Sequence, residues 1–246
     1  MSSSLLPITY RSILGVALPM MVSGFIQSIV LITDSAFISR YSVAGFDAVG
    51  NAGLAYITFY MMLLGMSDGA QILMARRIGE SREDQLGRIL NATWVILGIL
   101  AVIFFTILTL FIPSWISAYS RNQEVASLQG EFIRHRSFAL FFCMITLGFQ
   151  AFYLARGKSW VVLVAALITA STNILFDYLL IFGIGIFPEM GVAGAATASS
   201  IADGLGMMFL VIFTLSSKEN YAYHLFGTIK GIGFELKELI KIGTPL

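Results

Sequence analysis

The sequence predicts an all-α integral membrane protein with six transmembrane helices. Apolar residues make up 57% of the 246 residues and charged residues only 12%, whereas soluble domains average about 45–50% and about 25%. The apolar residues lie in long continuous stretches, and a helix needs about 20 mostly apolar residues to cross a bilayer. Because these stretches do not alternate between apolar and polar residues, a membrane β-barrel is disfavoured.

Six stretches qualify as spanning helices, in chain order. We expect them to form one membrane lobe within residues 1–233, with the first helix retained because no signal-peptide cleavage pattern follows it. Their approximate ranges are 13–39, 49–75, 89–113, 138–155, 160–182 and 190–215.

The lysines and arginines predict the orientation of the lobe. If the N-terminus lies inside, eleven of the fifteen fall on the inner side: Arg11, Arg76, Arg77, Arg82, Arg88, Arg156, Lys158, Lys218, Lys230, Lys237 and Lys241. The other four are Arg40, Arg121, Arg134 and Arg136. Positive charge accumulates in cytoplasmic loops, so we expect both termini in the cytoplasm. The membrane we expect is a plasma membrane, the inner membrane of a bacterium. Arg134 and Arg136 flank the fourth helix and are expected to snorkel to the outer interface.

Residues 234–246 differ from the rest of the chain. Apolar and charged residues alternate there with the spacing of a short amphipathic helix, which we expect to lie on the inner membrane surface. The final residues, from Gly243 to Leu246, resemble the glycine- and proline-containing run from Gly15 to Met20. Transporters are commonly built from such repeats, so this stretch predicts the start of a second six-helix lobe.

Four acidic residues lie within the predicted helices: Asp34, Asp68, Asp177 and Asp203. Each costs about 2.5–3.5 kcal/mol at a helix centre, so a functional role is the first interpretation. For Asp68 and Asp203, cavity lining and a structural bond to a neighbouring helix are equally good explanations.

A subset of polar residues is expected to share one level in the outer half of the membrane. From the helix rise, Asp34 and Asp177 each lie roughly 9 Å from the outer ends of their helices, and Ser199 roughly 12 Å. Asn173 precedes Asp177 by one helical turn and shares its face. Carboxylate, amide and hydroxyl oxygens suit a sodium ion or protons. The alternative is a structural hydrogen-bond network. Pro19 favours a kink in the first helix, either static or moving with the charge of Asp34.

In these residues the sequence resembles the multidrug and toxic compound extrusion family, the MATE transporters. The first helix has Pro19, Gln27 and Asp34 in the family's order, and the fifth has Asn173 and Asp177 at its spacing. The runs from Gly69 to Glu80 and from Gly191 to Ala196 also resemble the family's. The resemblance covers the whole chain but only the N-terminal half of a twelve-helix architecture, so a C-terminal six-helix lobe would be missing.

The resemblance implies an antiporter that exports cationic or amphipathic drug-like compounds in exchange for sodium ions or protons. It assigns the N-lobe cation site to Asp34, Asn173, Asp177 and Ser199, with serine in place of the family's threonine. Pro19, Gln27, Asp68 and Asp203 would be cavity or hinge residues, although Asp203 stands where a neutral polar residue is usual.

Other functions are less well supported by the residues. A lipid-linked oligosaccharide flippase of the same superfamily would be expected to carry several basic residues in its cavity, whereas the acids dominate here. No hydrolase or protease motif argues for an enzyme. No cofactor beyond the coupling ion is expected. The net charge of +1 and the absence of a basic run argue against nucleic acid.

Overall fold

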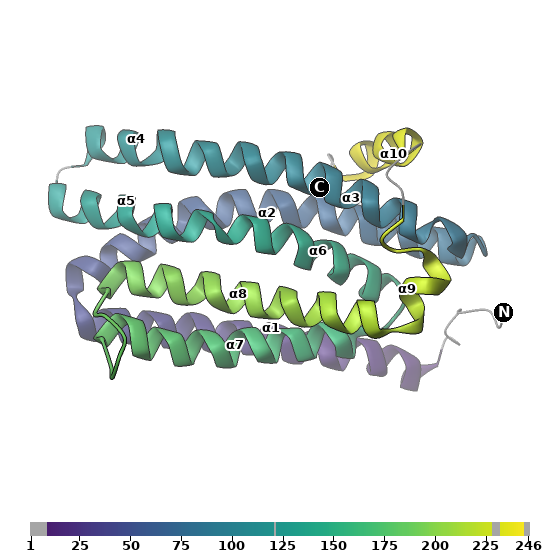
Figure 1. Cartoon of the computed structure of the whole chain (residues 1–246), viewed down its shortest axis with the longest axis horizontal. Helices are drawn as coiled ribbons and strands as arrows, with labels where there is room; N and C mark the ends of the chain where they lie inside the picture. Colours follow the sequence, from purple (N-terminus) through teal and green to yellow (C-terminus); the bar gives the residue numbers. More distant parts are fainter. Residues whose placement is uncertain (1–8, 121, 228–231, 244–246) are drawn as a thin grey trace.

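The computed structural model describes residues 9–120, 122–227 and 232–243, and these form a bundle of long, roughly antiparallel helices (Figure 1). The helices are α1 (Tyr10–Tyr41), α2 (Val43–Gly79), α3 (Leu86–Thr106), α4 (Ile112–Tyr119), α5 (Gln123–Ser137), α6 (Ala139–Ala155), α7 (Ser159–Phe182), α8 (Gly191–Ser216), α9 (Lys218–Tyr223) and α10 (Gly233–Gly243). Five segments of the described chain are long and apolar enough to cross a membrane, and the bent pair α5–α6 makes a sixth. This confirms the predicted all-α membrane fold.

Side-chain hydrogen bonds cap the N-terminal ends of α1 and α2. The Thr9 hydroxyl accepts a hydrogen bond from the Ser12 amide at the start of α1, and the Ser42 hydroxyl accepts one from the Gly45 amide at the start of α2. Such caps satisfy amide groups that the first turn of a helix leaves without partners. The α7 helix ends at Gly183, which has a φ of 65°, a conformation that favours glycine.

The fourth predicted stretch is the second half of a bent pair of helices. The apolar stretch at 138–155 corresponds to α6, which has only 17 residues, and α5 precedes it at an angle of 44°. Because α5 contains many polar residues, the pattern of apolar runs did not predict it as part of a span. Its buried residues include Gln129 and Ser137, which face neighbouring helices rather than lipid.

The third span is also longer than predicted. It continues past Pro113 as one spanning segment, Glu83–Ala118. A proline lacks an amide hydrogen and its ring clashes with the carbonyl four residues earlier. The helix accommodates Pro113 with a π-helical turn, Ile107–Phe111, directly before it.

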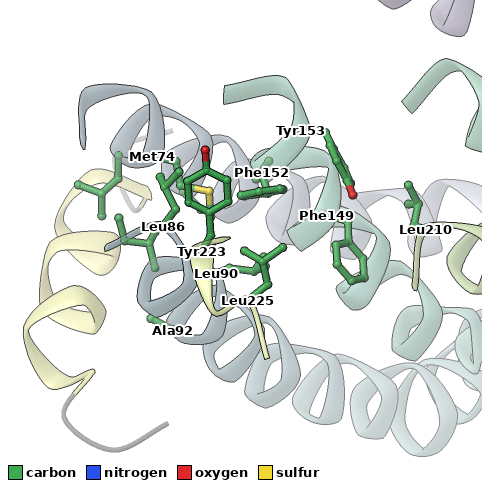
Figure 2. Packing of buried hydrophobic residues seen from close by; sticks show 14 of the residues in the cluster. Met74, Leu86, Leu90, Ala92, Phe149, Phe152, Tyr153, Leu210, Tyr223 and Leu225 are labelled. Carbon is green, nitrogen blue, oxygen red and sulfur yellow. The ribbon is translucent and has the colours of Figure 1, made fainter. Parts of the chain in front are cut away.

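Small residues bring α7 and α8 together at close range. A β-carbon on Gly194 of α8 would lie 2.7 Å from the carbonyl oxygen of Leu180 in α7. Lipid tails are as apolar as leucine, so helices in membranes associate largely through such tight packing. Aromatic side chains fill the bundle near α9, where Figure 2 shows Tyr223 beside Phe152, their ring centres 6.0 Å apart.

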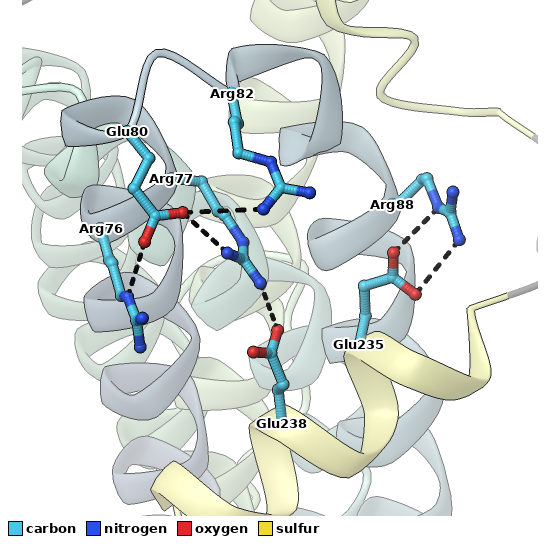
Figure 3. Close-up of polar contacts among 7 residues, drawn as sticks. All are labelled: Arg76, Arg77, Glu80, Arg82, Arg88, Glu235 and Glu238. Carbon is cyan, nitrogen blue, oxygen red and sulfur yellow. Dashed lines mark hydrogen bonds and ion pairs between the residues drawn. The ribbon is translucent and has the colours of Figure 1, made fainter.

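The predicted amphipathic helix is α10, and it packs against α2 and α3. Leu239 is buried in this contact. Two ion pairs join α10 to its neighbours (Figure 3): Arg77 of α2 pairs with Glu238 at 2.6 Å, and Arg88 of α3 pairs with Glu235 at 3.0 Å. We call this region, defined by Arg77, Arg88 and the turn between α2 and α3, the arginine-rich end. Arg121, Lys230 and residues 244–246, used in the charge count and the repeat comparison, lie outside the described residues.

Close backbone contact holds α10 on α2, and replacing Gly69 tests this contact. A β-carbon on Gly69 would lie 2.9 Å from the α-carbon of Gly243. Because the obstacle is backbone, we expect Gly69→Ala to displace α10. Overpacking of this kind costs about 1–3 kcal/mol, so amide hydrogen exchange across 233–243 should accelerate about tenfold.

The matched control is Gly65→Ala, one turn earlier on the same helix, where a β-carbon meets nothing within 4 Å. It should leave hydrogen exchange in α10 unchanged. Equal exchange rates in the two variants would show that Gly69 does not position α10.

Candidate functional site

Two carboxyl groups from helices far apart in sequence meet inside the bundle. Asp34 lies near the end of α1 and is half-buried, and Asp177 lies in α7 and is fully buried. Their side chains are within hydrogen-bonding reach of each other. Two ionised carboxylates repel strongly at such range in a medium of low dielectric constant. A proton or another cation between them would remove this repulsion.

An amide and a hydroxyl adjoin this carboxyl pair. Asn173 lies one turn before Asp177 on α7 and is buried. Its Nδ2 donates a hydrogen bond to the Ser199 hydroxyl of α8 at 3.2 Å. This bond directs the amide nitrogen toward α8 and leaves the amide oxygen, Oδ1, available. The structure thus places the four residues of the expected cation site on three helices that pack together.

The oxygens of this group have unused capacity to bind a cation. Buried oxygens usually accept hydrogen bonds, yet Asp34 Oδ1, Asn173 Oδ1 and both carboxylate oxygens of Asp177 are buried without a hydrogen-bond donor among the described residues. Hard oxygen donors without partners fit a small monovalent cation or protons. Within the part of the chain that the structure describes, no three His, Cys, Asp or Glu side chains gather as a metal site, so the amide and hydroxyl would have to complete any sodium coordination.

Asp203 has a specific partner that the sequence did not indicate. Arg136, at the end of α5, donates from Nη1 to Asp203 Oδ2 at 2.7 Å. Its guanidinium carbon also lies 4.5 Å from the centre of the Tyr56 ring, a cation–π arrangement. The expectation that Arg136 snorkels to the outer interface is therefore wrong. The side chain turns into the bundle because an acid and an aromatic ring stabilise it there.

The remaining expected residues lie apart from this cluster. Asp68 and Gln27 are on exposed faces of α2 and α1. The α1 helix runs without a break through Pro19, whose carbonyl oxygen accepts a hydrogen bond from the Ser23 hydroxyl at 2.8 Å.

Sequence reasoning missed the polar surroundings of Asp203. Besides Arg136, they include Cys143, whose sulfur lies 3.8 Å from Asp203 Oδ2 and 3.7 Å from the Tyr56 hydroxyl. The acid in α8 signalled that some partner existed, because an isolated charge in a span is costly. Nothing in the sequence distinguished Arg136 from Arg134 or from the other basic residues.

Comparison with known proteins identifies relatives of the chain. A family model described as MatE matches residues 19–179. A protein from Thermotoga maritima named "Probable multidrug resistance protein NorM" is 27% identical over 238 residues, which cover 96% of this chain and 50% of that protein. One of the same name from Rhizobium meliloti is 25% identical over 221 residues, covering 89% and 47%. The chain spans about half the length of these curated relatives.

Solved structures show the same fold. One described as the outward-facing conformation of a multidrug resistance MATE family transporter of the MOP superfamily aligns with a TM-score of 0.84 and 20% identity, covering 96% of this chain and 51% of that one. A MOP superfamily transporter from Pyrococcus furiosus, described as having a binding pocket of reverse polarity, gives 0.83 at the same identity and coverage. Since the family model matches more than half of the sequence, the resemblance is confirmed: this chain belongs to the MatE family, whose members are transporters rather than enzymes, and it has the fold of one half of a MATE transporter.

Proposed function

We propose that this chain forms the N-terminal lobe of a secondary antiporter that exports cationic or amphipathic compounds in exchange for sodium ions or protons. The observation that carries the proposal is the Asp34–Asp177 pair, whose buried oxygens without hydrogen-bond partners lie beside Asn173 and Ser199. The multidrug resistance names of the relatives support the substrate class.

The pair supplies a site whose charge changes when a cation binds. A sodium ion or proton neutralises the repulsion between the two carboxyl groups, so the packing of α1 against α7 differs between loaded and empty states. Pro19 removes a backbone hydrogen bond from α1 and offers a point at which the helix bends. One charge that crosses 100 mV releases about 2.3 kcal/mol, enough for roughly a 50-fold substrate gradient.

A second lobe is expected to complete the substrate cavity. The exposed face of α1 carries large apolar side chains, including Met21, Phe25 and Leu31. Lipid or another apolar helix surface is the environment that such a face requires. We therefore expect the six-helix chain alone to bind no drug in a closed cavity and to export none.

Imposed gradients test the proposed exchange in a full-length transporter that contains this chain. In proteoliposomes, we expect substrate movement under a sodium gradient at equal pH, under a proton gradient without sodium, or under both, because the oxygen site accepts either cation. Measuring fluorescent substrate uptake under each gradient checks this. Substrate movement that is equally fast with no cation gradient of either kind would contradict antiport.

We further propose that the arginine-rich end faces the cytoplasm of a bacterial inner membrane. The charge distribution favours this orientation. Cysteines at Ser81 and Ser217 should then react with an impermeant thiol reagent only after the membrane is opened, and a cysteine at Asn122 should react in intact cells. Each variant also carries Cys143→Ser. Labelling of Ser81→Cys in intact cells would reverse the orientation.

A further inference from the structure

An open groove lies between α8 and the bent pair α5–α6. The α8 helix is continuous and packs against both arms of the 44° bend (Figure 1). The groove has a volume of about 410 Å³, within the range of about 300–1,000 Å³ that small-molecule sites occupy. Its apolar walls are formed by Phe138, Phe142, Ile201, Leu205, Met207 and Met208. We call it the bend groove.

The polar side chains of the bend groove gather at one end, where they already have hydrogen-bond partners. The His135 ring nitrogen Nδ1 lies 3.2 Å from the Thr197 hydroxyl, and the Ser200 hydroxyl donates to the carbonyl oxygen of Ala196 at 2.8 Å. Among the described residues, no groove residue has a buried polar side-chain atom without a hydrogen-bond partner. The rest of the groove offers a ligand only apolar contacts, so its walls suit hydrocarbon.

The length of the bend groove matches one leaflet of a bilayer. Arg134 precedes Arg156, at the end of α6, by 22 residues, or about 33 Å along the helices, close to the roughly 30 Å of a bilayer core. His135 and its partner Thr197 therefore lie near the edge of that core. Met208 follows Thr197 by 11 residues on α8, which is about 16 Å, or roughly half the core. The groove thus runs from the headgroup level to the middle of the bilayer.

A positive charge stands at the headgroup end of the bend groove. Arg134 precedes Phe138 by four residues and so lies on the same helix face as this groove residue. It is exposed, and in the described part of the chain it forms no ion pair, not even with the exposed Glu131 three residues earlier. A guanidinium at this level attracts the phosphate of an anionic lipid.

We propose that the bend groove binds one anionic phospholipid, with an acyl chain along α8 and the phosphate at Arg134. The apolar walls, the length of one leaflet and the charge at one end together match an amphiphile that the bilayer itself supplies. In the proposed orientation, this lipid belongs to the outer leaflet. The inference does not depend on cation coupling, because no residue of the candidate cation site lines the groove.

Photolabelling in lipid nanodiscs tests this proposal. The full chain is placed in phosphatidylcholine nanodiscs that contain a small fraction of phosphatidylglycerol with a diazirine on one acyl chain. Light attaches this lipid to the residues beside the diazirine, and mass spectrometry of peptides locates and quantifies the adducts. With the diazirine at the end of the acyl chain, we expect adducts concentrated on Met207 and Met208. With the diazirine near the glycerol, we expect them on Phe138 and Ile201.

Filling the bend groove should exclude the lipid. Leu205→Trp places a larger side chain in it and should lower the adduct yield at least about fivefold, because overpacking an occupied space is costly. The matched control is Ile212→Trp, seven residues later on the same exposed helix face but outside the groove, and it should label like the parent. Gly204→Leu fills the groove from its floor, since a β-carbon there makes only an ordinary 3.5 Å contact with Phe142. It should reproduce the loss and keeps the proposal testable if Leu205→Trp does not fold.

Removing the charge should affect only the anionic lipid. Arg134→Gln should lower phosphatidylglycerol labelling about fivefold and leave labelling by phosphatidylcholine with the same diazirine unchanged. Arg40→Gln, an exposed arginine at the end of α1, is the control and should change neither.

Several results would overturn the proposal. These are unchanged labelling in both groove-filling variants, adducts spread evenly over the exposed faces of the helices, and an equal loss of labelling in Arg40→Gln. Disulfide-linked dimers of Leu205→Cys in a Cys143→Ser background would assign the groove to a second copy of the chain instead. Loss of the lipid adducts on adding excess fluorescent substrate would assign it to the exported compound.

Discussion

Replacing Asp177 by asparagine is expected to abolish active export in the full-length transporter while leaving its amount in the membrane largely unchanged. The carboxyl group is fully buried against Asp34, and asparagine removes the charge that a coupling cation neutralises. An amide is cheaper than a carboxylate inside a bilayer, so insertion should be no harder. Asp34→Asn should have the same effect, because both acids form one site.

The measurement is substrate efflux under fixed sodium and proton gradients, with the amount of protein determined by immunoblot. Asp47→Asn is the matched control, since Asp47 is exposed near the start of α2 and should export like the parent. Export by Asp177→Asn at the parental rate would make the carboxyl pair structural. Coupling would then have to reside in Asp68, Asp203 or the second lobe.

The second large effect is a loss of stability in Asp203→Asn. This change leaves the part-buried guanidinium of Arg136 without its 2.7 Å partner. Breaking one half of a buried ion pair costs about 3–5 kcal/mol. We expect a loss of about 3 kcal/mol, near the lower end, because both side chains keep some exposure. The measurement is the free energy of unfolding of the chain in bicelles under increasing sodium dodecyl sulfate.

Replacing both partners separates charge from shape. The double variant Arg136→Met with Asp203→Leu removes both charges and should recover most of the lost stability. Asp68→Asn is the control for loss of an acid as such, because Asp68 is exposed on α2. If Asp203→Asn unfolds like Asp68→Asn, the ion pair contributes little to the fold.

Hydrophobicity predicted most of the architecture, because the bilayer forces apolar residues into continuous helices. Hydrophobicity failed where the polar residues of one helix pack against a neighbouring helix. The α5 helix contains Gln129 and Arg136, so the apolar pattern predicted a helix that begins only at residue 138 and left out α5. Likewise, Pro113 marked the end of a helix by local rules, but the π-helical turn before it allows the span to continue.

The sequence likewise predicted only part of the candidate site. Helical spacing alone placed Asn173 with Asp177, and depth along the helices placed Asp34 at a similar level. The partner of Asp203 was out of reach, because it depends on how the bend between α5 and α6 turns Arg136 toward α8. Long-range pairings of this kind follow from tertiary packing, which no local pattern in one sequence records.

Mutual weakening of cation and drug binding tests the central claim most directly. If the site of Asp34 and Asp177 couples the two, saturating drug must weaken cation binding by the same factor by which saturating cation weakens drug binding. In the purified full-length transporter, we predict that the two factors are equal and greater than one. In Asp177→Asn, we predict that both factors fall to one. An unchanged factor in Asp177→Asn would contradict the assignment of the coupling site to this lobe.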